Sequence, residues 1–208
     1  MDEIKLKNAC IALGWEARYH KGEHLVGKGA FLPDLDSLDQ DFVKALEFFG
    51  VQKGRLLDIG TGLGMQAIRY AQSGFDVTAT DASSTSIETA RNKAAEQGMG
   101  AGSVTFIIDN ILGSAVDGLF DVITDRGCYT LLKDWMFEDY CRTVHRLLSP
   151  EGLFLLKVDA KRYEKIEPLK SRFCIVQSWD THYHGAQRQG PKAGFFILKP
   201  VVSIGLEC

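Results

Sequence analysis

Short apolar runs alternate with helix-like patterns from about residue 55 to the end of the chain. Five of these runs, at 56–59, 75–80, 104–108, 120–124 and 152–158, are rich in Leu, Val, Ile and Phe with few polar interruptions. Near-continuous apolar strands are typical of a parallel sheet that helices cover on both faces. The pattern therefore predicts five parallel strands connected through helices.

Three helices are expected in the gaps between these strands. The first spans 64–74. The second follows a pair of serines, has a capping-box pattern from Thr85 to Glu88 and ends at Gly98. The third spans about 134–148 and precedes the turn SPEG. Strand and helix thus alternate, as in an open α/β sheet.

The pattern changes after the fifth strand. Two further strands are expected at 172–179 and 193–199, and the loop DTHYHGAQRQGP joins them at 180–191. A direct loop connects antiparallel strands, whereas a parallel connection needs a crossover helix. The predicted fold class is α/β, with an open, mostly parallel seven-stranded sheet, helices on both faces and a reversed C-terminal hairpin strand.

The first fifty residues have a different character. A helix is expected to begin at Ser37, where Gln40 completes a capping box. The stretch before it, at 14–35, has neither the period of a helix nor that of a strand. For a chain of 208 residues one domain is expected. Residues 1–50 would form a cap or lid segment, and 51–208 the core of the sheet.

Composition and charge exclude several classes of protein. The net charge of -3 argues against a nucleic-acid partner, because nucleic-acid-binding surfaces are basic. No apolar run is long enough for a membrane span or a signal peptide, so a membrane partner is not expected. Five cysteines without a C-x-x-C pair indicate reduced thiols. A cytoplasmic location is expected, and the sequence leaves the oligomeric state open.

The most informative stretch is LLDIGTGLG at 56–64, in which a strand leads into glycines at every second position. Backbone N–H groups and the N-terminus of the following helix would face a ligand there. Dinucleotide-binding enzymes use G-x-G-x-x-G, but here Met65 occupies the place of the third glycine. Asp58, just ahead of the loop, would repel a pyrophosphate and attract an ammonium group. The motif therefore weighs against NAD.

The pattern D-x-G-x-G-x-G, from Asp58 to Gly64, resembles the first motif of the class I S-adenosylmethionine-dependent methyltransferases. Later positions match that family in order over 55–158, and the expected sheet is similar to the family's Rossmann-like fold. The resemblance implies S-adenosylmethionine as cofactor and S-adenosylhomocysteine as its product. It places these residues at the cofactor: Asp58, Gly60, Thr61, Gly62, Gly64, Asp81, Ala82, Asp109, Asn110, Ile111 and Asp125.

The resemblance also implies a role for each acidic position. Asp81 would hold the ribose hydroxyls, Asp109 and Asn110 would read the adenine, and Asp125 would line the methionine end and the methyl group. Each has a structural alternative. Asp81 could cap the following helix, Asp109 and Asn110 could form a turn, and the carboxylate of Asp125 could pair with Arg126.

Trp15 and Tyr19 lie in the N-terminal cap segment. A cap that carries aromatic residues resembles the thiopurine- and tellurite-type methyltransferases of small molecules, in which this segment closes over cofactor and acceptor. The resemblance implies that both side chains contact the ligand. Packing in the core is the alternative for both.

No catalytic residue is established by the sequence, because methyl transfer depends mainly on positioning the acceptor for in-line displacement. Asp125 and His182 are the candidates for proton transfer. Cys128 is disfavoured as a nucleophile, since free cysteines usually pack as small apolar residues. His182 and His184 are disfavoured as metal ligands, and no metal is expected.

The predicted function is methyl transfer to an S, N or O atom of a small-molecule acceptor, because a short cap can close a pocket but offers little surface for a macromolecule. The acceptor itself and the use of a general base stay open. The alternatives are a protein methyltransferase that acts on lysine or another side chain, an NAD(P)-dependent oxidoreductase, and a non-catalytic adenosyl-binding protein.

Overall fold

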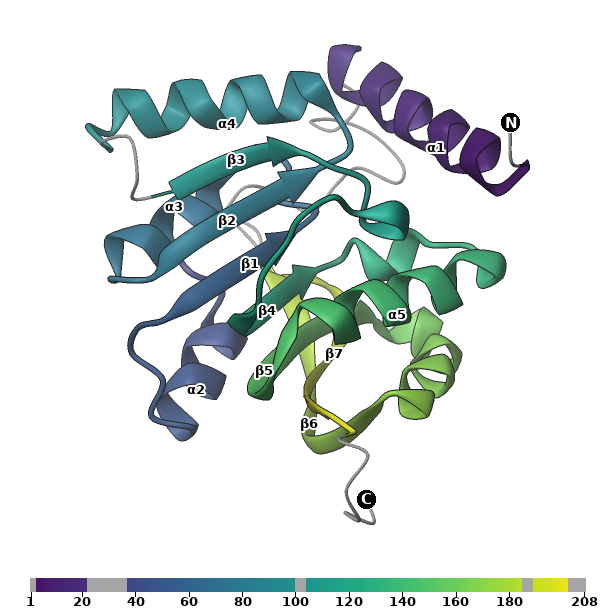
Figure 1. The fold of residues 1–208 in the computed structure, drawn as a ribbon. Coiled ribbons are helices and arrows are strands. Elements are labelled where there is room, and N and C mark those ends of the chain that lie inside the picture. The colour runs from purple at the N-terminus through teal and green to yellow at the C-terminus, as the bar shows by residue number, and fades with distance from the viewer. Residues whose placement is uncertain (1–2, 22–36, 100–103, 185–188, 202–208) are drawn as a thin grey trace.

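The computed structural model describes residues 3–21, 37–99, 104–184 and 189–201, and it contains one seven-stranded sheet (Figure 1). The strands are β1 (Arg55–Ile59), β2 (Asp76–Asp81), β3 (Val104–Ile108), β4 (Phe120–Arg126), β5 (Leu148–Asp159), β6 (Phe173–His184) and β7 (Gln189–Pro200). The α-helices are α1 (Glu3–His20), α2 (Gln40–Phe48), α3 (Met65–Gln72), α4 (Ser84–Glu96) and α5 (Phe137–Leu147). Four 3-10 helices are η1 (Ile111–Gly113), η2 (Tyr129–Leu131), η3 (Asp134–Met136) and η4 (Ala160–Ser171).

The strand order β3-β2-β1-β4-β5-β7-β6 confirms the predicted fold class. Strands β1 to β5 pair in parallel, whereas β7 runs antiparallel to both β5 and β6. The parallel strands are connected through helical segments, which such crossovers need. The reversed strand arises because β6 and β7 follow each other directly.

Helices cover both faces of the sheet, which explains the continuous apolar strands. Leu56 of β1 packs in a buried layer with residues of α2, α3 and α4. The next residue, Leu57, packs in a second layer with residues of α5. Successive side chains of a strand point to opposite faces, so most positions of a doubly covered strand are apolar.

Two predicted helix starts were wrong by a few residues. The cap of α2 is Asp39, whose carboxylate accepts from the N–H of Asp41, and the helix begins at Gln40 instead of Ser37. The cap of α4 is Ser83, whose hydroxyl accepts from the N–H of Ser86 at 3.1 Å. Several Ser, Thr and Asp residues precede each helix, and local sequence does not decide which of them caps it. In the third helix, the first predicted turn is the 3-10 segment η3.

The N-terminal segment differs most from its prediction, because residues 14–20 belong to the helix α1. Gly14, Trp15 and Tyr19 have low intrinsic helix propensity. Glu16 accepts hydrogen bonds from the start of α4, and the side chain of Tyr19 is buried. Tertiary contacts thus stabilise a helix that its own sequence does not favour. Of the predicted cap segment 1–50, residues 22–36 lie outside the described residues, and 40–48 form α2, which packs in the core layer that contains Leu56.

The C-terminal hairpin is longer than predicted. The stretch 180–191 was expected to be loop, but β6 extends to His184 and β7 begins at Gln189. The segment SPEG, predicted as a turn, lies within β5. The prediction of reduced thiols agrees with three described cysteines, which are free, and is wrong for Cys174, which is disulfide-bonded.

Candidate functional site

The glycine loop joins β1 to α3 at the carboxyl edge of the parallel strands. Gly60, Gly62 and Gly64 have φ values of +64°, +57° and +82°, which side chains of other residues rarely tolerate. A Cβ atom on Gly62 would lie 3.0 Å from the hydroxyl of Tyr19. The N–H of Thr61 donates to the carbonyl of Thr80 at 2.9 Å, which holds the loop beside β2. The conformation of this loop therefore requires glycine, and its backbone packs closely against neighbouring groups such as Tyr19.

Asp58 lies in β1 immediately before the loop, and its side chain is buried. Thr124 of β4 donates a hydrogen bond of 2.8 Å to its carboxylate. Burial raises the pKa of Asp58 to about 6, although this hydrogen bond opposes the shift. A cationic partner would stabilise the ionised form of this buried carboxylate.

Asp81 ends β2 and connects three parts of the site. Its carboxylate accepts from the N–H of Gly62 at 3.0 Å and from the N–H of Ser83 at 2.9 Å. Burial raises the pKa of Asp81, against the effect of these two hydrogen bonds. Ala82, which follows it, is partly exposed. Since each carboxylate oxygen has two lone pairs, Asp81 can still accept from hydroxyl groups of a ligand.

Asp109 and Asn110 follow β3 and lie beside Asp81. The N–H of Asp109 donates to the carbonyl of Asp81 at 2.9 Å. One carboxylate oxygen of Asp109 accepts from the N–H of Ala115, whereas the other is buried and has no hydrogen-bond partner within the described part of the chain. Asn110 caps η1, whose first residue, Ile111, is buried. Asp109 and Asn110 thus do form a turn, as the structural alternative proposed. The second carboxylate oxygen of Asp109 can still accept from a ligand.

Asp125, near the end of β4, has a buried carboxylate that already accepts three hydrogen bonds. It accepts from the N–H groups of Gly127 and Tyr129, each at 2.9 Å, and from the hydroxyl of Tyr140 at 2.6 Å. Burial raises the pKa of Asp125 to about 7. The side chain of Arg126 donates to Asp39 instead of Asp125. The Asp125–Arg126 pair considered from the sequence is therefore not formed.

Cys128 lies against the glycine loop. A Cβ atom on Gly60 would lie only 2.7 Å from the Cβ of Cys128. Burial, with the nearby charge of Asp125, raises the pKa of the Cys128 thiol well above its usual value. The thiol therefore stays protonated, which agrees with the sequence-based argument against a nucleophilic cysteine.

The helix α1 crosses beside the N-terminus of α4 (Figure 1). The side chain of Tyr19 is 7% exposed and lies next to Gly62. Trp15 is half-buried, and the guanidinium group of Arg18 lies 4.9 Å from its ring centre. Glu16 was not predicted to be a site residue, because a lone glutamate in a segment that shows no helical period carries no local signal.

A buried charge cluster at the carboxyl ends of β4 and β5 was also missed. Lys157, which is fully buried, donates to Asp39 and Asp41 of the α2 N-terminus, and Arg126 donates to Asp39 at 2.9 Å. Trp179 and other groups of β6 complete the cluster. These residues are up to 140 positions apart in sequence, so no local motif could reveal them.

His182 does not lie in a loop as expected. It belongs to β6 and pairs with Lys192 of β7, at the sheet edge that β4, β5 and β7 separate from β1. The side chain of His184 lies outside the described residues. Among the residues that the structure describes, no three His, Cys, Asp or Glu side chains gather as a metal site.

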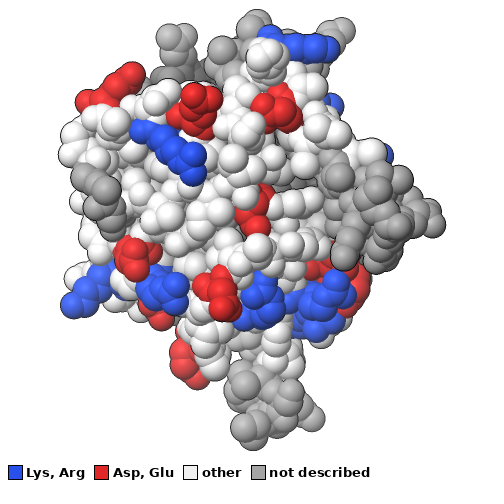
Figure 2. Space-filling view, turned by 45° about the horizontal axis from the view of Figure 1, so that its top comes forward, with Lys and Arg blue, Asp and Glu red and all other residues white. Residues whose placement is uncertain are grey.

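The surface offers no broad patch of one charge on the face drawn in Figure 2. Lysine and arginine side chains alternate there with aspartate and glutamate along the lower rim of the described surface. Within the described ranges, no helix has both the length and the apolar character that crossing a membrane requires.

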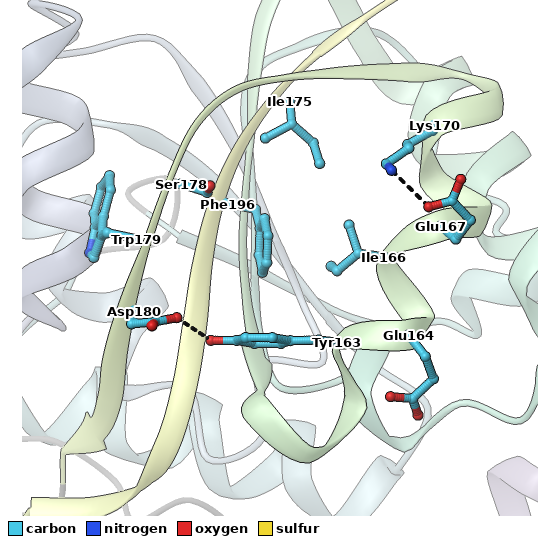
Figure 3. A pocket seen from close by; sticks show the side chains of 10 residues that line it. All are labelled: Tyr163, Glu164, Ile166, Glu167, Lys170, Ile175, Ser178, Trp179, Asp180 and Phe196. Carbon is cyan, nitrogen blue, oxygen red and sulfur yellow. Dashed lines mark hydrogen bonds and ion pairs between the residues drawn. The ribbon is translucent and has the colours of Figure 1, made fainter.

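A separate cavity of about 500 Å³ lies between η4 and the β6–β7 hairpin (Figure 3). In Figure 3 the hydroxyl of Tyr163 points to Asp180, to which it donates at 2.8 Å. The lining residues are Tyr163, Glu164, Ile166, Glu167, Lys170, Ile175, Ser178, Trp179, Asp180 and Phe196. None of them belongs to β1, the glycine loop or α1, so the cavity is distinct from the site at Asp58 and Asp81.

The residues at the glycine loop fit an adenosyl cofactor with an amino-acid tail. The buried oxygen of Asp109 is an acceptor without a partner in the described part of the chain, which suits an amino donor. Asp81 can accept from hydroxyl groups, and Asp58 suits an ammonium group. The three glycines of the adjacent loop have positive φ values, which side chains rarely tolerate.

Comparisons with known proteins agree with this arrangement. Residues 56–152 match the family model described as a methyltransferase domain. A ubiquinone biosynthesis O-methyltransferase of Caulobacter sp. (strain K31) is 38% identical over 102 residues, which are 49% of this chain and 39% of that protein. The chain thus spans less than half the length of this curated relative.

Solved structures show the same fold over most of the chain. The 1,6-didemethyltoxoflavin-N1-methyltransferase of Burkholderia thailandensis, solved with S-adenosylhomocysteine, has a TM-score of 0.74 at 18% identity and covers 97% of this chain and 92% of its own. A TehB-like S-adenosylmethionine-dependent methyltransferase of Corynebacterium glutamicum has a TM-score of 0.64 at 14% identity. The match covers 92% of this chain and 99% of that protein. In its motif, its fold and the methyltransferase domain matched at 56–152, the chain is similar to the class I S-adenosylmethionine-dependent methyltransferases.

Proposed function

We propose that this protein transfers a methyl group from S-adenosylmethionine to an S, N or O atom of a small-molecule acceptor. The observation that carries the small-acceptor part is the cover over the glycine loop. Tyr19 lies against Gly62, and Glu16 attaches the same helix to the start of α4. A site covered in this way favours an acceptor that enters a pocket over a peptide that needs an open channel.

Each acidic residue of the site has a proposed binding role. Asp58 would hold the ammonium group of the methionine end, Asp81 the ribose hydroxyls and Asp109 the adenine amino group. Thr61, Ala82, Asn110 and Ile111 would line the same space, with Trp15 and Tyr19 on the side of α1. When bound, the cofactor supplies a methyl group on a positively charged sulfur, which makes that carbon electrophilic.

No residue is assigned as a general base. The carboxylate of Asp125 already accepts three hydrogen bonds, so we assign it the role of shaping the loop that carries Cys128. The Cys128 thiol remains protonated. The contribution of the chain is therefore to hold the acceptor in line and to exclude water, and an acceptor that loses its proton in solution needs no base.

Two of the similar proteins are named for small acceptors, and their names differ in the acceptor atom. One is named as an O-methyltransferase of ubiquinone biosynthesis, and another methylates N1 of 1,6-didemethyltoxoflavin. Since the sequence match covers less than half of the first and the second is only 18% identical, we extend from them only the small-molecule class and leave the atom open.

The test is an acceptor screen with purified protein and S-adenosylmethionine, in which the formation of S-adenosylhomocysteine is measured. Pools of thiols, amines and phenols form one arm, and unfolded and folded protein extracts form the other. We expect product with at least one small-molecule pool. Product with protein extracts alone would establish the protein-methyltransferase alternative, and binding of S-adenosylhomocysteine without turnover in either arm would favour a non-catalytic binding protein.

A further inference from the structure

Glu16 makes a cluster of hydrogen bonds far from its neighbours in sequence. Its carboxylate accepts from the hydroxyl of Ser83 at 2.6 Å, from the N–H of Thr85 at 3.2 Å and from the hydroxyl of Thr85. These are charge-assisted bonds at a helix N-terminus, where a negative charge is favoured. The hydrogen bonds from Ser83 and Thr85 lower the pKa of Glu16 to about 2, so the carboxylate is ionised at any neutral pH.

The partners of Glu16 are next to the residue that we assign to the ribose. Ser83 also donates its N–H to Asp81 at 2.9 Å, and Asp81 accepts in turn from Gly62 of the glycine loop. Three hydrogen bonds therefore connect Glu16 to the loop, by way of Ser83 and Asp81. The contact joins α1 to the part of the fold that is built around the cofactor site.

Tyr19 lies one turn after Glu16 on the same helix, and positions three residues apart lie on one side of a helix. Its hydroxyl lies 3.0 Å from the position that a Cβ atom of Gly62 would take. Attachment of Glu16 to α4 thus sets the place of Tyr19 above the glycine loop. The intrinsic helix propensity of this segment is low, so the attachment helps to hold it as a helix and to orient it.

We propose that Glu16 is a positioning residue, which holds α1 against α4 so that Tyr19 closes the cofactor cradle and slows the release of the cofactor. This inference rests on the proposed function, because it assumes that the cradle holds an S-adenosyl ligand. It adds a residue outside the matched methyltransferase domain, which begins at Leu56. Glu16 would touch neither the cofactor nor the acceptor, and would act through Tyr19.

The experiment measures binding and dissociation of S-adenosylhomocysteine on the immobilised full chain by surface plasmon resonance. Glu16→Gln removes the charge and keeps the shape. We expect its dissociation rate to rise about tenfold and its association rate to change by less than about twofold, because the contact stabilises the closed state. Glu96→Gln is the matched control, since it removes an exposed carboxylate from the far end of α4.

A second background separates this role from a merely structural one. If Glu16 acts through Tyr19, then adding Glu16→Gln to a Tyr19→Leu protein does not raise the dissociation rate further. This holds even if each of the two substitutions lowers the free energy of unfolding. Equal dissociation rates for Glu16→Gln and Glu96→Gln would overturn the inference, as would an undiminished effect in the Tyr19→Leu background. Failure of the unaltered protein to bind S-adenosylhomocysteine would instead overturn the proposed function itself.

Discussion

Lys157 and Asp39 form a buried ion pair across 118 positions of sequence, in which the ammonium group donates to both carboxylate oxygens at 2.9 Å. The same ammonium group donates to Asp41 at 2.6 Å. Burial by itself would raise the pKa of Asp41, but hydrogen bonds from Lys157, Trp179 and Thr181 outweigh it, and the pKa is lowered. The pair connects the start of α2 to the end of β5, next to the loop that follows β4.

Lys157→Met should therefore destabilise the protein strongly. It leaves Asp39 and Asp41 without their shared cation, and removing one partner of a buried pair costs about 3–5 kcal/mol. Urea unfolding measures the loss. Lys170→Met is the control, because Lys170 is exposed and forms a surface ion pair with Glu167, so its loss should be below about 1 kcal/mol. Equal losses for the two variants would show that the buried cluster contributes no more than a surface pair.

Gly62→Ala should weaken the binding of S-adenosylhomocysteine at least about tenfold. The added methyl group would enter the space that we assign to the cofactor and would lie 3.0 Å from the hydroxyl of Tyr19. Its positive φ of +57° also adds backbone strain of about 1–2 kcal/mol. Calorimetric titration measures the affinity.

Gly74→Ala separates strain from close approach. Gly74 also has a positive φ, of +102°, but a Cβ atom there would meet nothing within 4 Å. We expect it to lower the free energy of unfolding without changing the affinity. Similar affinities for the two alanine variants would contradict the role of Gly62 in the cradle.

Asp109→Asn should separate binding from stability. The asparagine keeps the acceptor for the N–H of Ala115, but its amide group cannot accept from an adenine amino group where the second carboxylate oxygen now lies. We expect affinity for S-adenosylhomocysteine to fall by about 1–3 kcal/mol, with an unchanged or higher free energy of unfolding. Unchanged affinity would favour the reading of Asp109 as a turn residue alone.

The affinity for S-adenosylhomocysteine should fall as the pH is lowered through the pKa of Asp58, which burial raises to about 6. Above that pH the carboxylate is ionised and can pair with the ligand ammonium group. Titrations between about pH 5 and about pH 8 measure the trend. In Asp58→Asn the affinity should be weak, and the part of the pH dependence due to this carboxyl should be absent.

The same raised pKa acts in the opposite direction on the stability of the empty protein. A carboxyl group with a folded-state pKa above its ordinary value of 3.8 favours folding most at low pH. The contribution of Asp58 is present below about pH 4 and is lost as the pH rises through about 6. The unfolding free energies of the parent protein and of Asp58→Asn should therefore differ more at neutral pH than at about pH 4.

Several features could be predicted from local sequence because their physical cause is local. The parallel strands follow from apolar runs such as 104–108, whose bounds agree with β3. The reversed strand follows from the direct connection of β6 to β7. The left-handed glycines and the acids at the ends of β1, β2 and β3 follow from the motif and from the order of the strands, since parallel strands bring their carboxyl ends to one edge.

Other features could not be predicted because partners distant in sequence decide them. Residues 14–20 lack a helical pattern and form a helix through Glu16 and Tyr19. The caps of α2 and α4 are Asp39 and Ser83, chosen among several possible residues by the packing of each helix.

The sequence by itself thus determined the class of the fold, the resemblance to methyltransferases and the edge of the sheet where the candidate site lies, because apolar period and glycine spacing act within a few residues. The tertiary structure alone decided which side chains cover that edge and which carboxylates are already engaged. Asp125 is the plainest example: its position after β4 is readable in the chain, but its bonds to Tyr129 and Tyr140 depend on how the buried layer below it packs.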